Sequence, residues 1–108
     1  MNKMEIKPNS SRTVCKDGVS LSVQSSRMHY CEPRNDEGPY SLVEVGYVKG
    51  ADGVQFCPPD SWKDYADLGF PSDVYGFVPV ELVKAFIAKH GGEEIASAPS
   101  LFEMPVLI

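Results

Sequence analysis

The clearest hydrophobic pattern in this chain lies in residues 74–92. Apolar positions there recur every three or four residues, which is the spacing of one face of a helix. That face contains Val80, Leu82, Val83, Phe86, Ile87 and His90. Pro79 suits the first helical position because its missing N–H would have no partner there, and Gly91 or Gly92 supplies the left-handed residue that closes many helices. We predict a helix over residues 79–90 that packs its apolar face on a sheet.

Two features border this helix. Val78 precedes a proline and is therefore excluded from the α region, which predicts a strand over residues 74–78. His90 falls within the apolar face at the other end, where a functional ligand is one interpretation. Because no acidic or cysteine residue lies at helical spacing from it, we interpret His90 as a structural residue near the helix end.

Alternation of apolar and polar residues over positions 19–24 predicts a half-buried strand. Its inner face would carry Val19, Leu21 and Val23. Asp17-Gly18 is a favoured two-residue hairpin turn, so the residues before it are expected to form the partner strand. That turn places Val14 opposite Leu21 and puts Cys15 on the polar side.

A long loop and a second clear strand follow. Residues 25–39 contain turn residues and mixed charge without a clean period, which predicts a loop with at most one helical turn. Residues 40–48 alternate again and predict a strand. One face of that strand would carry Val43, Val45 and Tyr47, and the other Leu42, Glu44 and Gly46. After a glycine-rich turn at residues 49–53, residues 54–57 predict a short hairpin partner.

Residues 60–67 predict a short helix with Asp60 as its N-cap. On a helical wheel the apolar side carries Trp62, Tyr65 and Ala66. The opposite side carries an acidic stripe of Asp60, Asp64 and Asp67, at positions i, i+4 and i+7. We expect the aromatic side to pack on the sheet and the acidic stripe to face solvent.

The order of these elements predicts one small domain, for which 108 residues suffice. We expect residues 1–12 to form a flexible leader and residues 13–92 a single α+β domain. Residues 93–108 are an apolar C-terminal tail that adds an edge strand, covers the sheet or contacts a partner. The fold class is α+β: a small, mostly antiparallel sheet of three to five strands, with the C-terminal amphipathic helix packed on one face and one short acidic helix.

Composition adds an uneven distribution of charge. The chain carries 15 acidic and 10 basic residues. Residues 1–31 hold five bases and two acids, whereas residues 32–73 hold nine acids and three bases. Most of these acids lie in predicted loops or on the exposed side of the short helix. We predict that this acidic middle binds a partner through Glu32, Asp36, Glu37, Asp60, Asp64, Asp67 and Asp73.

The spacing of the acidic stripe indicates a kind of partner. Carboxylates at i, i+4 and i+7 of a helix are about 6 and 10 Å apart along its axis, similar to successive phosphates on a nucleic-acid strand. Such a nucleic-acid mimic fits a protein complex with a basic nucleic-acid-binding surface, and the same acids disfavour direct binding of DNA or RNA. The alternative is that these aspartates form only a solvated face. A calcium site is disfavoured because DxDxDG spacing is absent.

Cysteine content and the N-terminal sequence indicate a cytoplasmic protein. Cys15, Cys31 and Cys57 are an odd number without a CxxC pair, which is typical of free thiols in a reducing compartment. Residues 1–12 lack the apolar centre of a signal peptide, and no apolar run is long enough to span a membrane. We expect no membrane partner, no small-molecule substrate and no cofactor.

The sequence contains no strong catalytic pattern, and we expect a protein that is not an enzyme. The glycines form neither GxGxxG nor GxxxxGK[ST], so no phosphate-binding loop is indicated. His29 and Cys31 would supply a base and a nucleophile, but no third orienting group accompanies them. A zinc site from these two residues with Cys15 or Cys57 is disfavoured because HxC lacks a second ligand pair. The alternative stays open: a small metal- or thiol-dependent enzyme or sensor centred on His29, Cys31 and Cys57.

Three sequence blocks resemble small uncharacterised proteins encoded by tailed bacteriophages and prophages. The blocks are CKDGVSLSVQSS, HYCEPRNDEGPYSLVEVGY and VYGFVPVELVKAFIAKHGG. They cover roughly residues 14–92, and the segment of residues 49–72 and the tail depart from the pattern. The resemblance brings no catalytic residues. Small acidic phage proteins of this kind resemble inhibitors of host machinery, including anti-CRISPR proteins, some of which present acidic surfaces to nucleic-acid-binding subunits.

Charge and resemblance together lead to one functional hypothesis. We expect a phage-encoded interaction protein in the cytoplasm of a bacterial host. It would inhibit a host defence or nucleic-acid-processing complex by stoichiometric binding through its acidic surface. A structural phage component that self-assembles is a further alternative.

Overall fold

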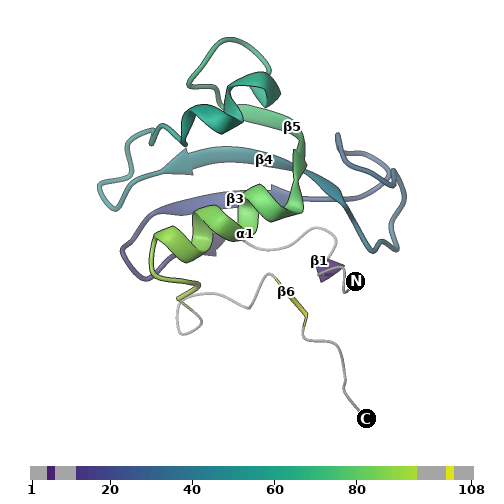
Figure 1. Cartoon of the computed structure of the whole chain (residues 1–108), viewed down its shortest axis with the longest axis horizontal. Helices are drawn as coiled ribbons and strands as arrows, with labels where there is room; N and C mark the ends of the chain where they lie inside the picture. Colours follow the sequence, from purple (N-terminus) through teal and green to yellow (C-terminus); the bar gives the residue numbers. More distant parts are fainter. Residues whose placement is uncertain (1–4, 7–11, 95–101, 104–108) are drawn as a thin grey trace.

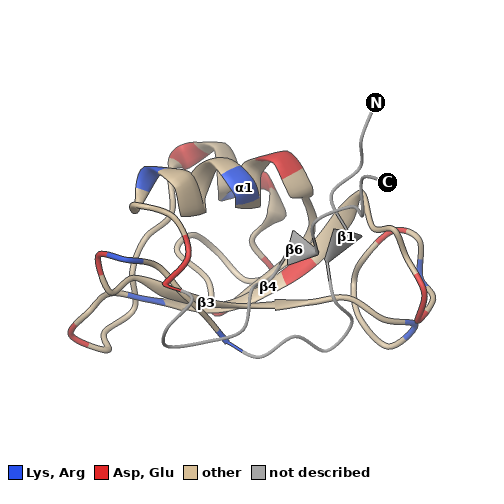
Figure 2. Ribbon diagram, turned by 90° about the horizontal axis from the view of Figure 1, so that it is seen from below, with Lys and Arg blue, Asp and Glu red and all other residues tan. Residues whose placement is uncertain are grey.

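The computed structural model describes residues 5–6, 12–94 and 102–103 of the chain. Its main sheet has four antiparallel strands in the order β2-β3-β4-β5. They are β2 (Thr13–Val14), β3 (Ser20–Gln24), β4 (Leu42–Lys49) and β5 (Val74–Pro79). One α-helix, α1 (Val80–Lys89), lies over one face of the sheet, and a short 3₁₀ helix, η1 (Asp60–Tyr65), lies beside β5 (Figure 1; Figure 2). This architecture confirms the predicted α+β fold.

Helix α1 begins and ends close to where the local signals predict. Pro79 occupies the N-cap. At the other end, the Gly92 N–H donates to the Ile87 carbonyl at 2.9 Å and the Gly91 N–H to the Ala88 carbonyl at 3.1 Å. Both glycines have positive φ, 93° at Gly91 and 89° at Gly92. They therefore form the paired closing hydrogen bonds of a Schellman motif.

An aromatic cluster holds α1 and η1 on the sheet. The buried residues of α1 are Val80, Val83, Phe86 and Ile87. The Phe86 ring centroid lies 5.4 Å from that of Trp62 in η1, and Trp62 lies 5.5 Å from Tyr75 of β5 in an edge contact. Trp62 and Tyr75 are buried. The apolar sides predicted for both helices therefore meet in one core.

The first hairpin differs from the prediction by one residue. Its hydrogen bonds close a loop of three residues, 16–18, with Gly18 at a φ of 95°. Val14 therefore lies opposite Ser20 instead of Leu21, and Cys15 is buried instead of lying on the polar side. The prediction was wrong because a left-handed glycine also closes three-residue loops, and a slip of one residue moves each side chain of a strand to the other face.

Strand β4 contains a bulge that the alternating sequence does not reveal. Between its pairs with Ser22 and Ser20 of β3, β4 advances three residues instead of two. Tyr47 lies in this stretch with a φ of 49° and is 55% exposed, and Val48 is buried instead. The prediction that Tyr47 shares a face with Val43 and Val45 was wrong, because the extra residue reverses the alternation beyond it.

Strand β5 contains a second bulge of the same kind. Between its pairs with Val45 and Val43 of β4, β5 advances three residues instead of two. Phe77 lies in this stretch with a φ of 55°, which is unusual for a bulky side chain. Each bulge thus turns an aromatic side chain toward the surface directly after a glycine.

The acidic helix is shorter than predicted and is a 3₁₀ helix. It ends at Tyr65, and Pro59 instead of Asp60 occupies its N-cap. A 3₁₀ helix has three residues per turn, so Asp60 and Asp64 point in different directions, and Asp67 lies beyond the helix end. The predicted stripe of three aspartates was therefore wrong, because its geometry needs an α-helix of at least eight residues.

Short segments hydrogen-bond to both outer strands of the main sheet. Beside β2, the Glu94 N–H donates to the Val14 carbonyl at 2.7 Å. Beside β5, the Asp67 N–H donates to the Val74 carbonyl at 3.0 Å. The described start of the C-terminal tail thus acts as an edge segment, which is one of its three predicted roles.

Two further segments pair outside the main sheet: the described chain ends with each other, and the segment after β4 through a single bridge. Strand β1 (Glu5–Ile6) pairs antiparallel with β6 (Phe102–Glu103) in a separate two-stranded sheet. The predicted flexible leader and apolar tail otherwise lie outside the described residues. The predicted strand at residues 54–57 was wrong: it reduces to one bridge between Gln55 and Lys49. Two prolines follow directly at residues 58–59, and neither has an N–H to continue the pairing.

Candidate functional site

The acids predicted to bind a partner are all exposed, but they do not form one continuous surface. They are Glu32, Asp36, Glu37, Asp60, Asp64, Asp67 and Asp73. The first three lie in the loop of residues 25–41 at one end of the sheet, and the next three lie on or just after η1 (Figure 1). That loop carries acidic and basic residues close together, at the right of Figure 2. The structure thus brings together only parts of the predicted site.

The predicted acids also differ in whether a partner already neutralises them. The Asp36 carboxylate accepts a hydrogen bond from the Arg27 backbone N–H at 3.0 Å and lies 3.6 Å from Arg27 Nε. Asp73 Oδ1 accepts a hydrogen bond from Gln55 Nε2 at 3.3 Å. By contrast, no hydrogen bond or ion pair joins any side chain in the described ranges to the carboxylates of Glu32, Glu37, Asp60, Asp64 and Asp67. Of these five exposed acids, Asp64 and Asp67 also line a pocket.

A groove at the outer edge of β5 combines Asp64 and Asp67 with aromatic side chains. Two segments contact this edge: residues 66–67 on one side, and Tyr30, whose carbonyl accepts a hydrogen bond from the Phe77 N–H at 3.0 Å. Between them lies a groove of about 330 Å³. Its aromatic and acidic residues are Tyr30, Tyr65, Phe77, Asp64 and Asp67. This volume lies at the small end of the range for ligand-binding pockets.

Two aromatic residues of the groove are almost half exposed to solvent. The Tyr30 and Phe77 rings lie 5.8 Å apart at an angle of 35°, with 48% and 42% of each residue exposed. Tyr30 reaches β5 because position 76 is glycine: a Cβ on Gly76 would lie 3.2 Å from the Tyr30 Cβ. Paired, exposed aromatic rings beside a pocket are typical of binding surfaces.

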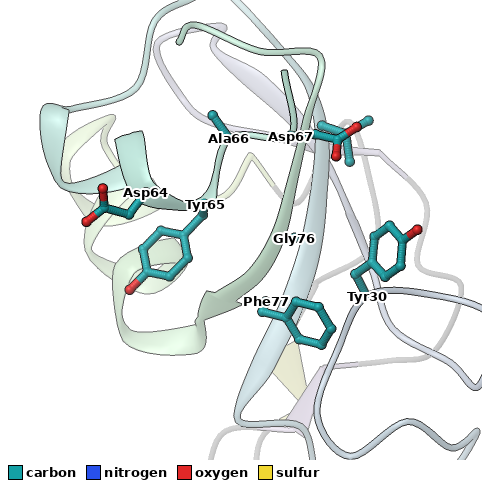
Figure 3. Close-up of a pocket in the computed structure, with 8 residues that line it drawn as sticks. Tyr30, Asp64, Tyr65, Ala66, Asp67, Gly76 and Phe77 are labelled. Atoms are coloured by element: carbon teal, nitrogen blue, oxygen red, sulfur yellow. The ribbon is translucent and has the colours of Figure 1, made fainter. Parts of the chain in front are cut away.

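Figure 3 shows how these side chains are oriented around Gly76. Tyr65 lies on one side of β5, and Tyr30 and Phe77 lie on the other. Asp67 is above the Tyr30 ring on the same side, whereas the Asp64 carboxylate points away from Gly76 at the outer end of the groove. Asp67 is therefore the carboxylate that belongs with the aromatic pair, and Asp64 lies at the rim.

Backbone geometry sets the position of the Phe77 ring. A φ of 55° is a sparsely populated conformation for a residue with a Cβ, and it costs on the order of 1 kcal/mol or more. The bulge that contains Phe77 turns its ring out of the core, while Tyr75 and Val78 on either side are buried. Conformations of this kind concentrate at functional sites, which is one reason to place the candidate site here.

The residues of the thiol hypothesis are not arranged as a nucleophile and its base. His29 Nδ1 is hydrogen-bonded to Ser26 Oγ at 2.6 Å, and Cys31 Sγ donates to the Ser26 carbonyl at 3.1 Å. Cys31 is buried, and this burial raises the pKa of its thiol, which opposes formation of the reactive thiolate. In the part of the chain that the structure describes, no group of three His, Cys, Asp or Glu side chains is placed to hold a metal ion. The thiol hypothesis stays a prediction that these contacts do not support.

The sequence reasoning selected acids and missed the aromatic residues Tyr30, Tyr65 and Phe77. Tyr30 lies in a loop without a periodic pattern, so its contact with β5 has no local signal. A local signal does exist for Phe77, because Gly76 interrupts the strand pattern before it. A glycine inside a strand often marks a bulge or a close approach of another segment. The same reasoning applies to Gly46 before Tyr47.

No protein family model, no curated protein and no solved structure matches this chain. The resemblance to phage proteins therefore stays a prediction. Among the described residues, no helix has the length and apolar character needed to cross a membrane.

Proposed function

We propose that this protein is a small phage-encoded inhibitor of the anti-CRISPR type. It would bind a host defence or nucleic-acid-processing complex in stoichiometric amounts, in the cytoplasm of a bacterial cell, and would not contact nucleic acid itself. The observation that carries the proposal is the groove beside β5, where Asp64 and Asp67 are exposed and have no side-chain partner among the residues that the structure describes. Unneutralised carboxylates beside open aromatic rings favour a cationic protein surface.

The centre that we propose for this surface is not the acidic stripe expected from the sequence. Glu32, Asp36 and Glu37 share their loop with Arg27 and Arg34, so their net field is weaker than their number implies. Carboxylates near η1 have one basic neighbour within that element, Lys63. We therefore place the binding centre at the β5 groove, with the loop acids as a secondary contribution.

Electrostatic attraction of this kind has a measurable signature. Exposed charges are screened beyond about 8 Å at physiological ionic strength and beyond about 3 Å at 1 M salt. Attraction between an acidic surface and a basic partner accelerates association, and added salt reduces it. Binding of the proposed partner should therefore weaken steadily as salt is added.

The test is affinity capture of partners from a bacterial host, followed by titration of the captured complex. Asp67→Lys is expected to weaken binding roughly tenfold, because it places a like charge against the cationic partner. Glu81→Lys is the matched control, since Glu81 is an exposed acid in the first turn of α1 and outside the groove. We expect that control to change binding by less than about twofold.

Three results would contradict the proposal. Equal effects of Asp67→Lys and Glu81→Lys would mean that overall charge, and not the groove, governs binding. Unchanged binding in both variants would make the acidic surface irrelevant. Stable self-assembly of the purified chain without a captured partner would favour a structural phage component.

A further inference from the structure

The open aromatic pair in the β5 groove is not explained by an acidic surface alone. Carboxylates suffice to attract a basic protein, and phosphate mimicry requires no aromatic ring. Yet Tyr30 and Phe77 keep 48% and 42% of their surface exposed beside Asp67. An aromatic face next to a carboxylate attracts a cation in two ways, through the ring quadrupole and through direct charge pairing.

The chain itself already places a guanidinium on one of these rings. Arg34 Cζ lies 5.5 Å from the centroid of the Tyr30 ring, and Arg34 Nε donates a hydrogen bond to the His29 carbonyl at 3.1 Å. This contact shows that the Tyr30 ring is placed where a planar cation can approach it. Phe77 has no such cation among the contacts of the described residues.

The size and charge of the groove select one kind of occupant. A volume of about 330 Å³ is near the lower limit for a small-molecule pocket and fits one long side chain. Guanidinium groups stack on aromatic faces and bind carboxylates through two parallel hydrogen bonds, whereas an ammonium group is more strongly hydrated and does neither as well. Arginine therefore fits an aromatic ring next to a carboxylate better than lysine does.

We infer that the β5 groove binds an arginine side chain of the partner protein. The methylene groups of that arginine lie against Gly76. Its guanidinium lies on the Phe77 ring, which carries no cation of the described residues, and pairs with the Asp67 carboxylate. This inference rests on the proposed function, because it names the partner group that the acidic surface receives. It also makes a separate claim, that the groove recognises a guanidinium without the rest of the partner.

That separate claim can be tested with the protein alone. We suggest titrating the full ¹⁵N-labelled chain with the capped tripeptide Gly-Arg-Gly and, in parallel, with capped Gly-Lys-Gly. The expected result is saturable movement of the Asp67, Gly76 and Phe77 amide signals with the arginine peptide, at an affinity in the millimolar range typical of one side chain. The lysine peptide should bind at least about threefold more weakly.

Two variants locate the binding and have a matched control. Asp67→Asn should weaken binding of the arginine peptide about fivefold, because it removes a charge-assisted hydrogen bond worth roughly 1 kcal/mol at an exposed site. Phe77→Leu keeps an apolar side chain without the ring and should weaken binding about threefold. Asp60→Asn removes the same charge outside the groove and should change binding by less than about twofold. Dispersed amide spectra of each variant confirm that it is folded.

Each other outcome overturns the inference in a defined way. Equal binding of the two peptides means that the groove does not distinguish a guanidinium. If Asp67→Asn and Asp60→Asn weaken binding of the arginine peptide equally, the peptide is attracted by the overall negative charge of the protein and not by the groove. If no amide near β5 responds while the captured partner still binds, this inference fails and the proposed function stands. If the peptide binds as expected but Asp67→Lys does not affect the partner, the groove is a guanidinium site and the proposed function fails.

Discussion

The carboxylate of Asp17 and the imidazole of His90 are joined by a hydrogen bond of 2.6 Å between Oδ2 and Nδ1, although 73 positions separate them in the chain. The contact ties the turn of the first hairpin to the end of α1, where the Asp17 N–H also donates to the His90 carbonyl at 3.3 Å. The His90 ring is further held by Phe86, at 4.6 Å between centroids, and by Phe56, at 5.2 Å. His90 is therefore the structural residue that the sequence predicts.

This contact predicts that Asp17 contributes a pH-dependent part of the stability. The hydrogen bond from the Val19 N–H and then the one from His90 hold the pKa of Asp17 below its ordinary value. A carboxyl whose pKa is lowered on folding stabilises the protein above its unfolded-state pKa, near 4, and loses that effect as the pH falls through the folded-state value. Asp17→Asn should therefore lower the free energy of unfolding at pH 6.5, and the difference from wild type should shrink toward pH 3.

Urea unfolding at the two pH values measures this difference. Asp52→Asn is the matched control, because Asp52 accepts the same kind of turn hydrogen bond from the Val54 N–H at 3.0 Å but has no histidine partner. A difference between Asp17→Asn and wild type that is equal at both pH values would show that the carboxylate charge does not matter.

Among the core side chains, removal of Trp62 should lower the free energy of unfolding most. It is 1% exposed and contacts both Tyr75 and Phe86. Trp62→Ala leaves a large cavity and should lower the free energy of unfolding by about 3–5 kcal/mol. Leu68→Ala, at a position 84% exposed, should change it by less than about 0.5 kcal/mol. The chain has one tryptophan, so unfolding has to be followed by circular dichroism; equal midpoints for the two variants would refute the placement of Trp62.

The bulge at Tyr47 predicts an unusual order of substitutions. Glycine adopts a φ of 49° without steric cost, whereas a β-branched residue is least tolerant of it. Tyr47→Gly should therefore be neutral or stabilise the protein by up to about 1 kcal/mol, although glycine normally weakens a strand. Tyr47→Val should destabilise it by about 1 kcal/mol, despite the high strand propensity of valine. Thermal melts of the two variants decide between this order and the reverse order expected of a regular strand.

The three thiols should react at very different rates. Cys57 is exposed, whereas Cys15 and Cys31 are buried. Burial raises the pKa of Cys15 to about 11, so its reactive thiolate is scarce at neutral pH. We expect one thiol to be alkylated in the native protein at the rate of an ordinary exposed cysteine, and the other two only after unfolding. Mass spectrometry of iodoacetamide-treated protein identifies the residues, and fast alkylation of Cys31 would revive the thiol hypothesis.

The sequence is most informative where local chemistry sets the structure. Pro79 and the Gly91-Gly92 pair act within a few residues of themselves, so the limits of α1 could be predicted closely. Both bulges depend instead on how β4 meets its neighbours. The alternation of residues 40–48 shows no extra residue at Tyr47, and Gly46 is the one local sign of that bulge. The form of η1 also depends on tertiary contacts, since Trp62 is fixed by α1 and β5.

In the candidate site, too, some features follow from local sequence and others from tertiary contacts. Acidic residues are visible in the composition, and their exposure could be predicted because charged side chains are rarely buried without a partner. The groove exists because Tyr30 and residues 66–67 contact the same edge of β5 from two distant parts of the chain. No single-sequence pattern encodes that meeting, so the aromatic half of the site needed the structure.

The segments beside the outer strands have a consequence for how this protein meets other chains. An unoccupied strand edge is a template for edge-to-edge aggregation and for the addition of a foreign strand. Here the carbonyls of Val14 on one outer strand and Val74 on the other already accept hydrogen bonds from Glu94 and Asp67. A second copy would first have to displace these bonds. We therefore expect the protein to stay dispersed at the concentrations that the peptide titration needs, and its partner to be recognised by side chains and not by main-chain pairing.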